Sequence, residues 1–106
     1  MRSIGTVVEE ETNRPLAGLL VRAYDKDLLK DDHLGDTHTD ADGRFEISYT
    51  DVQFRDLHET LPDVYLRIYD ASGERLLYST EKAVRKNALV LEKFEIRIPR
   101  AKLGGS

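Results

Sequence analysis

The chain lacks cysteine and tryptophan altogether and has only 3 prolines among its 106 residues. Without cysteine, neither a disulfide nor a thiolate metal site can stabilise the fold, so an apolar core has to do so. No apolar run is long enough to form a membrane span or the hydrophobic part of a signal peptide. Lysine and arginine do not cluster as nucleic-acid binding requires, so we expect no nucleic-acid partner.

The composition that is present, 40% hydrophobic and 34% charged, is typical of a folded globular domain. The length suits one domain, which we expect to span residues 1–103. Residues 104–106, Gly-Gly-Ser, have almost no side chain to pack and are predicted to be a flexible tail or a linker remnant. The formal charge of −4 is uneven: residues 25–42 hold seven aspartates and two lysines, giving −5, and the remainder sums to +1. This segment is the acidic pole of the chain.

Short apolar runs separated by turn residues predict β-strands rather than helices. The expected strands cover residues 4–8, 19–24, 44–50, 64–69, 75–80 and 94–98, with another extended segment at 37–39. They predict an all-β fold, an antiparallel β-sandwich of seven to eight strands. The alternation of apolar and polar residues places these side chains in the core: Val21, Phe45, Leu66, Ile68 and Phe94.

Three connections have their own signals. Residues 25–36 are too polar for a strand and are expected to loop across one end of the sandwich. Residues 40–43, Asp-Ala-Asp-Gly, predict a tight turn with positive φ at Gly43 and a hairpin into the following strand. Within residues 51–59, apolar and polar side chains recur at helical spacing with Asp51 as a candidate N-cap, which predicts one short helical turn.

Several of these segments together resemble the transthyretin-like, or carboxypeptidase-regulatory-like, β-sandwich modules. The matching segments are residues 5–7 (Gly-Thr-Val), 15–19 (Pro-Leu-Ala-Gly-Leu), 39–45 (Thr-Asp-Ala-Asp-Gly-Arg-Phe) and the late strand 92–99. The resemblance implies a prealbumin-type sandwich. Residues 25–28 (Asp-Lys-Asp-Leu), 34–35 (Leu-Gly) and 62–65 (Pro-Asp-Val-Tyr) are similar to a bacterial subtype found in larger multi-domain proteins, secreted, surface-associated or toxin-related. It implies an accessory role beside neighbouring domains or a protein partner.

Related sandwiches include enzymes, namely 5-hydroxyisourate hydrolases and intradiol dioxygenases. The hydrolases use an early-strand histidine, an arginine and a C-terminal motif ending Arg-Gly-Ser, whereas here the first strand has no histidine and the chain ends Gly-Gly-Ser. The dioxygenases bind ferric iron through tyrosines and histidines, but His33, His38 and His58 lack the paired spacing of such a site. We therefore expect no catalytic residues and no cofactor, and a hydrolase-like enzyme is the last of the alternatives.

The acidic pole supplies the candidate metal site. Calcium takes roughly six to eight oxygen ligands, and one short segment offers five carboxylates. They belong to Asp25, Asp27, Asp31, Asp32 and Asp36. If these side chains converge, the domain is a calcium-stabilised adhesion or binding module. The other interpretation is that the aspartates cap turns and keep a loop solvated.

Tyrosine and arginine occupy the outward positions of two predicted strands, which is typical of docking surfaces. This candidate interaction surface consists of Tyr24, Tyr65, Tyr69, Arg22 and Arg67. Ordinary cross-strand packing on a half-exposed sheet explains the same pattern. The leading hypothesis is a non-catalytic accessory module that spaces or docks within a larger protein or assembly, and the calcium-stabilised module is the second.

Overall fold

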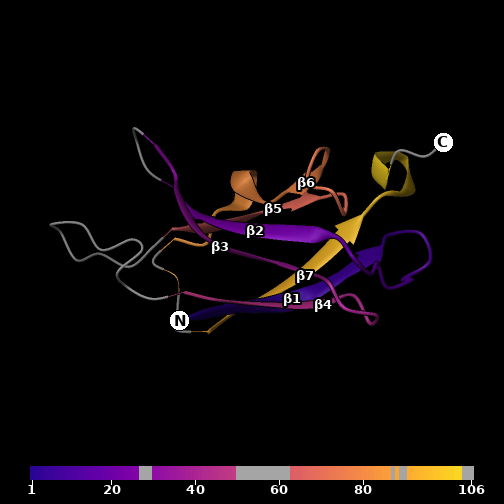
Figure 1. Ribbon diagram of the computed structural model, residues 1–106, viewed down its shortest axis with the longest axis horizontal. Helices are drawn as coiled ribbons and strands as arrows, with labels where there is room; N and C mark the ends of the chain where they lie inside the picture. The colour runs from indigo at the N-terminus through magenta and orange to yellow at the C-terminus, as the bar shows by residue number, and fades with distance from the viewer. Residues whose placement is uncertain (27–29, 50–62, 87, 89–90, 104–106) are drawn as a thin grey trace, which may run out of the picture.

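The computed structural model describes residues 1–26, 30–49, 63–86, 88 and 91–103. They form a β-sandwich of two facing sheets, shown in Figure 1, which confirms the predicted fold. No helix among these residues is long and apolar enough to cross a membrane. The predicted helical turn within 51–59 and the predicted tail at 104–106 both lie outside the described residues.

The two sheets have three and four strands. The first sheet has the order β4-β1-β7, with β1 at Arg2–Glu9, β4 at Arg44–Ser48 and β7 at Leu91–Ile98. The second has the order β3-β2-β5-β6, with β2 at Leu20–Asp25, β3 at Asp32–His38, β5 at Val64–Tyr69 and β6 at Leu76–Ser79. Two short 3-10 helices follow β6 and β7, η2 at Glu81–Ala83 and η3 at Arg100–Leu103.

One strand pair corrects the expectation of a wholly antiparallel sandwich. β1 pairs antiparallel with β4 but parallel with β7, from Arg2 opposite Leu91 to Glu9 opposite Ile98. A tight turn between two strands forces them to be antiparallel, whereas a long connection leaves either direction open. Here most of the chain separates the two strands, which run side by side in Figure 1.

The predicted loop at residues 25–36 is wrong in its second half, because β3 already begins at Asp32. β3 pairs with β2 and forms the edge of its sheet, so most of its polar side chains reach solvent. Only Leu34 is fully buried in it. β3 has a bulge opposite the Ala23–Tyr24 step, and its extra residue breaks the strict alternation of inward and outward side chains. Leu34 can therefore point into the core although its neighbours are polar.

The predicted tight turn at residues 40–43 is confirmed, but it does not close a hairpin. The Asp40 carboxylate accepts hydrogen bonds from the backbone N–H groups of Asp42 and Arg44, both at 2.9 Å. Gly43 has a φ of 72°, and a Cβ there would stand 2.5 Å from the carbonyl oxygen of Val7. The turn carries the chain from one sheet to the other, because β3 and β4 belong to different sheets.

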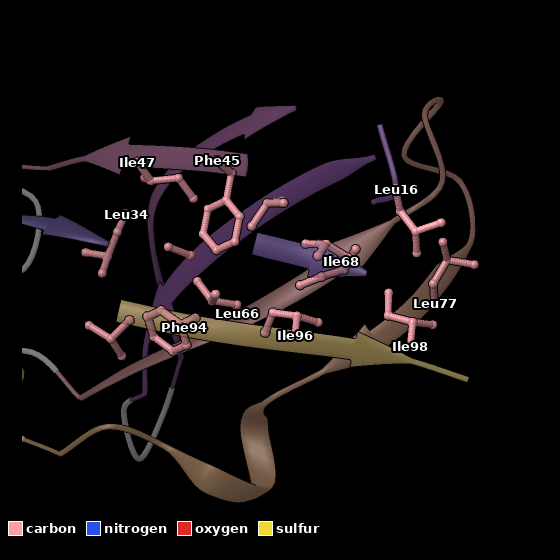
Figure 2. Packing of buried hydrophobic residues seen from close by; sticks show 14 of the residues in the cluster. Leu16, Leu34, Phe45, Ile47, Leu66, Ile68, Leu77, Phe94, Ile96 and Ile98 are labelled. Atoms are coloured by element: carbon pink, nitrogen blue, oxygen red, sulfur yellow. The ribbon is translucent and has the colours of Figure 1, made fainter. Parts of the chain in front are cut away.

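The core lies between the sheets and is built from the inward positions of both (Figure 2). All five side chains predicted for it are buried, with exposed fractions between 0% and 5%. The ring of Phe45 lies against the backbone of β1 at Gly5, where a Cβ would come within 2.9 Å of the ring. A side chain at Gly5 would stand closer still to the carbonyl oxygen of Phe94, so only glycine allows this close approach.

A buried carboxylate fixes the end of β1. Glu9 accepts hydrogen bonds from Thr12 at 2.7 Å and from the guanidinium of Arg100, at the start of η3, at 3.3 Å. Arg14 stands 3.4 Å from the same carboxylate. The hydrogen bonds from Arg100 and Thr12 lower the pKa of Glu9 from 4.5 to about 2, so it stays charged and holds η3 against the first strand.

Candidate interaction surface

The four-stranded sheet carries its polar side chains on the face that points away from the core, here called the outer face. Across β2 and β5, Arg22 lies opposite Arg67 and Tyr24 lies opposite Tyr65, while Ala23 between them faces the core. Alternation along each strand therefore places the predicted tyrosines and arginines together.

Those five residues form one stacked group, the tyrosine–arginine cluster (Tyr24, Tyr65, Tyr69, Arg22, Arg67). The guanidinium of Arg22 lies 5.1 Å from the ring centre of Tyr69. That of Arg67 lies 5.1 Å from the ring of Tyr24 and 5.6 Å from that of Tyr65. The rings of Tyr24 and Tyr65 stack with centres 5.3 Å apart. Cation–π and stacking contacts of this kind hold the guanidinium groups in place on the sheet.

Tyr65 differs from its neighbours, because its side chain is fully buried although it points to the outer face. The ring of Tyr24 covers it, the ammonium of Lys26 lies 5.8 Å from its ring centre, and its hydroxyl donates a hydrogen bond to Asp31. Burial, together with this hydrogen bond to a carboxylate, raises the pKa of Tyr65 well above its usual range. Tyr65 supports the outer face from below and offers no surface to a partner.

An ion-pair network borders the cluster. The ammonium of Lys26 lies 2.6 Å from Glu81 and 3.6 Å from Asp31, and Arg67 lies 3.2 Å from Glu81. The hydrogen bond from Lys26 lowers the pKa of Glu81 most, and that from Arg67 lowers it further. Glu81 was not predicted as part of this surface, because it follows β6 in a segment without periodicity. It comes close to Lys26 only when the strands are paired. No local signal identifies it.

The arginines of the cluster remain accessible. The side chains of Arg22 and Arg67 are 36% and 34% exposed. Arg22 has a loose partner in Asp36 at 3.8 Å, and His33 approaches the same carboxylate at 3.8 Å. The outer face thus presents the guanidinium groups of Arg22 and Arg67 beside the rings of Tyr24 and Tyr69.

The structure places four of the five candidate calcium ligands, and Asp27 lies outside the described residues. Asp25 and Asp32 are cross-strand partners, and Asp25 accepts a hydrogen bond from the backbone N–H of Asp63 at 2.9 Å. Asp31 contacts Lys26 and the hydroxyl of Tyr65, as described above.

Asp36 instead lies beside Arg22 and His33. Within the described ranges, no three histidine, aspartate or glutamate side chains are arranged to hold a metal ion. Convergence of all five aspartates around calcium therefore stays a prediction.

The histidines considered for catalysis are dispersed. His33 and His38 lie exposed on β3. His38 approaches the carbonyl oxygen of Ala71 at 3.4 Å, and the ring of His33 is tilted against that of Tyr24 with centres 5.6 Å apart. His58 lies outside the described residues.

The fold and this surface define a β-sandwich domain whose four-stranded sheet carries a cluster of tyrosine and arginine side chains on its outer face. A family model for the transthyretin-like family matches residues 12–99, and the chain belongs to that family. Among solved structures it is similar to a 9R-lipoxygenase from Cyanothece PCC8801, with a TM-score of 0.65 and 26% identity. That match covers 90% of this chain and only 16% of the lipoxygenase chain. A search of curated proteins finds no match.

Proposed function

We propose that this chain is a non-catalytic accessory module that docks within a larger protein or assembly through the outer face of its four-stranded sheet. The observation that carries the proposal is the tyrosine–arginine cluster. Tyrosine and arginine, together with tryptophan, are enriched at the energetic centres of protein interfaces. In this cluster the rings and Glu81 already hold the Arg67 guanidinium, so binding a partner freezes little additional side-chain motion.

The likeness to the lipoxygenase supports the modular part of the proposal. The matching sandwich is a small share of that longer chain, so a fold of this kind occurs as one part of a larger protein. The activity in that protein's name is not proposed for this chain. Only the arrangement is proposed for this chain, namely a small sandwich that forms one part of a larger protein.

Hydroxyl-radical footprinting tests the proposal. The oxidation rates of Tyr24 and Tyr69 are compared in the 106-residue chain alone and in the native full-length gene product or its assembly. Docking through the outer face is expected to slow both rates several-fold. Ile4, which lies on the opposite sheet and is partly exposed, is the control and is expected to react equally in both samples. Equal rates at Tyr24 and Tyr69 would overturn the proposal.

A further inference from the structure

A second surface lies at the edge of the four-stranded sheet. β6 pairs with β5 on one side and has no neighbouring strand on the other within the described residues. A groove of about 690 Å³ adjoins this edge and is lined by all four residues of β6, Leu76, Leu77, Tyr78 and Ser79. Leu76 is 49% exposed and is the only large hydrophobic side chain so exposed in the part of the chain that the structure describes.

The rim of the groove is positively charged. Lys102 of η3 lines the groove near the start of β6, where its carbonyl oxygen accepts a hydrogen bond from Arg75 at 3.1 Å. Glu81 and Lys82 follow the end of β6, and Lys26 pairs with Glu81 there. Glu81 is already neutralised by Lys26 at 2.6 Å and by Arg67. Lys82 and Lys102 are exposed and form no ion pair with any described residue.

We propose that this groove binds an extended acidic segment of a protein partner, which adds to β6 as a further strand. The unpartnered strand edge supplies backbone hydrogen bonds. The apolar floor around Leu76 accepts every second side chain, because neighbouring residues of a strand point to opposite faces. Lys82 and Lys102 then pair with carboxylates near the two ends of the segment. This inference goes beyond docking through the tyrosine–arginine cluster, because the added strand lies along the edge of the sheet at β6.

Charge decides between this occupant and a second copy of the chain. A two-fold dimer through β6 makes the two edge strands antiparallel, so the end that carries Lys82 meets the partner end that carries Lys102. Each such approach brings like charges together, which is unfavourable at an interface. An acidic strand meets both lysines with opposite charge.

The test uses a fluorescent, capped peptide of alternating valine and glutamate, about eight residues long, and fluorescence anisotropy. Binding in the micromolar range is expected, weakening as salt is added. The double variant Lys82→Glu/Lys102→Glu is expected to bind about tenfold more weakly or worse. Lys86→Glu/Lys93→Glu changes the net charge equally, at exposed lysines away from the groove, and is expected to bind as the wild type does.

Further samples separate the alternatives. The same peptide with alternate backbone nitrogens methylated keeps its side chains but loses its strand hydrogen bonds, and its binding is expected to disappear. Arg22→Glu, on the outer face, is expected to leave peptide binding unchanged, so this result does not depend on the footprinting result. The inference is overturned if the methylated peptide binds equally well, if both double variants lose equal affinity, or if the wild type does not bind the peptide. It is also overturned if sedimentation detects a dimer that the single variant Lys82→Glu strengthens, because that change places a carboxylate opposite Lys102 of the second copy.

Discussion

Replacing Tyr65 with phenylalanine removes a single oxygen from beneath the outer face and leaves the ring in place. The hydroxyl of Tyr65 donates a hydrogen bond to Asp31, and the side chain that carries it is fully buried. The stacking on Tyr24 does not involve that oxygen and should survive. The variant therefore isolates the contribution of one charge-assisted hydrogen bond.

The expected magnitude follows from the surroundings of Asp31. A hydrogen bond to a charged group contributes about 1.5–3 kcal/mol to stability. The Asp31 side chain is 21% exposed and keeps Lys26 at 3.6 Å, so water and the ammonium replace part of the lost bond. We expect a loss near the lower limit, about 1.5 kcal/mol. In a domain of this size such a loss lowers the Tm by roughly 6–9 °C.

The assay is thermal and denaturant unfolding at neutral pH, with Tyr78→Phe as the matched control. Tyr78 is a half-buried tyrosine whose hydroxyl has no hydrogen bond to a described residue, and its replacement is expected to cost less than about 0.5 kcal/mol. If Tyr65→Phe unfolds within about 0.5 kcal/mol of the wild type, the hydroxyl does not bind Asp31 in solution and the reasoning fails.

A second readout comes from alkaline pH. The folded-state pKa of Tyr65 lies above its unfolded value of 10.0, because burial and Asp31 both favour the neutral phenol. The stability that Tyr65 contributes is therefore fully present below pH 10.0 and is lost as the pH rises above it. The difference in stability between the wild type and Tyr65→Phe should accordingly shrink above that pH. A difference that stays constant or grows there would contradict the assignment.

Three further predictions use the same unfolding assays. Phe45→Ala is expected to cost about 3–5 kcal/mol, because it empties a buried site, and a loss below about 1 kcal/mol would place the ring at the surface. Glu9→Gln should remove a contribution to stability that depends on pH. Because the pKa of Glu9 is lowered in the folded state, this contribution is present above pH 4.5 and is lost as the pH falls toward about 2. If the variant and the wild type lose the same stability between these pH values, the contact with Arg100 is refuted. The calcium hypothesis predicts that millimolar calcium raises the Tm by several degrees more than sodium chloride of equal ionic strength, with Asp27→Asn and Asp32→Asn abolishing the rise; equal midpoints would reject it.

Local alternation in the sequence was enough to find most strands and the centre of the core. Residues 64–69 were predicted as a strand and form β5 with the same bounds, because apolar and polar residues alternate there without interruption. Phe94 was assigned to the core by the same parity and is buried. Periodicity identifies these residues because one face of each strand packs against the core and the other face contacts water.

The features that could not be predicted from the sequence depend on contacts between distant segments. Leu20 alternates with the core residue Val21 and lies on the same face as Arg22, yet it is buried, because the turn at Gly73 closes over it. Tyr65 was assigned to the outer face correctly, but its burial comes from Tyr24, Lys26 and Asp31, which only the register brings together. A pattern along one strand carries no information about what covers its outer face.

The parallel pairing of β1 and β7 has a consequence for how the chain folds. β1 is the central strand of its sheet, yet the edge that receives β7 stays open until the last strand has been synthesised. Pairing Arg2 with Leu91 closes a loop of nearly the whole chain, and contacts of such high order slow folding to milliseconds or seconds. A ribosome-bound chain that ends before residue 91 exposes that edge to neighbouring nascent chains. Folding of this domain should therefore be late and cooperative, and a truncation that removes β7 should be more damaging than one that removes the same length of exposed loop.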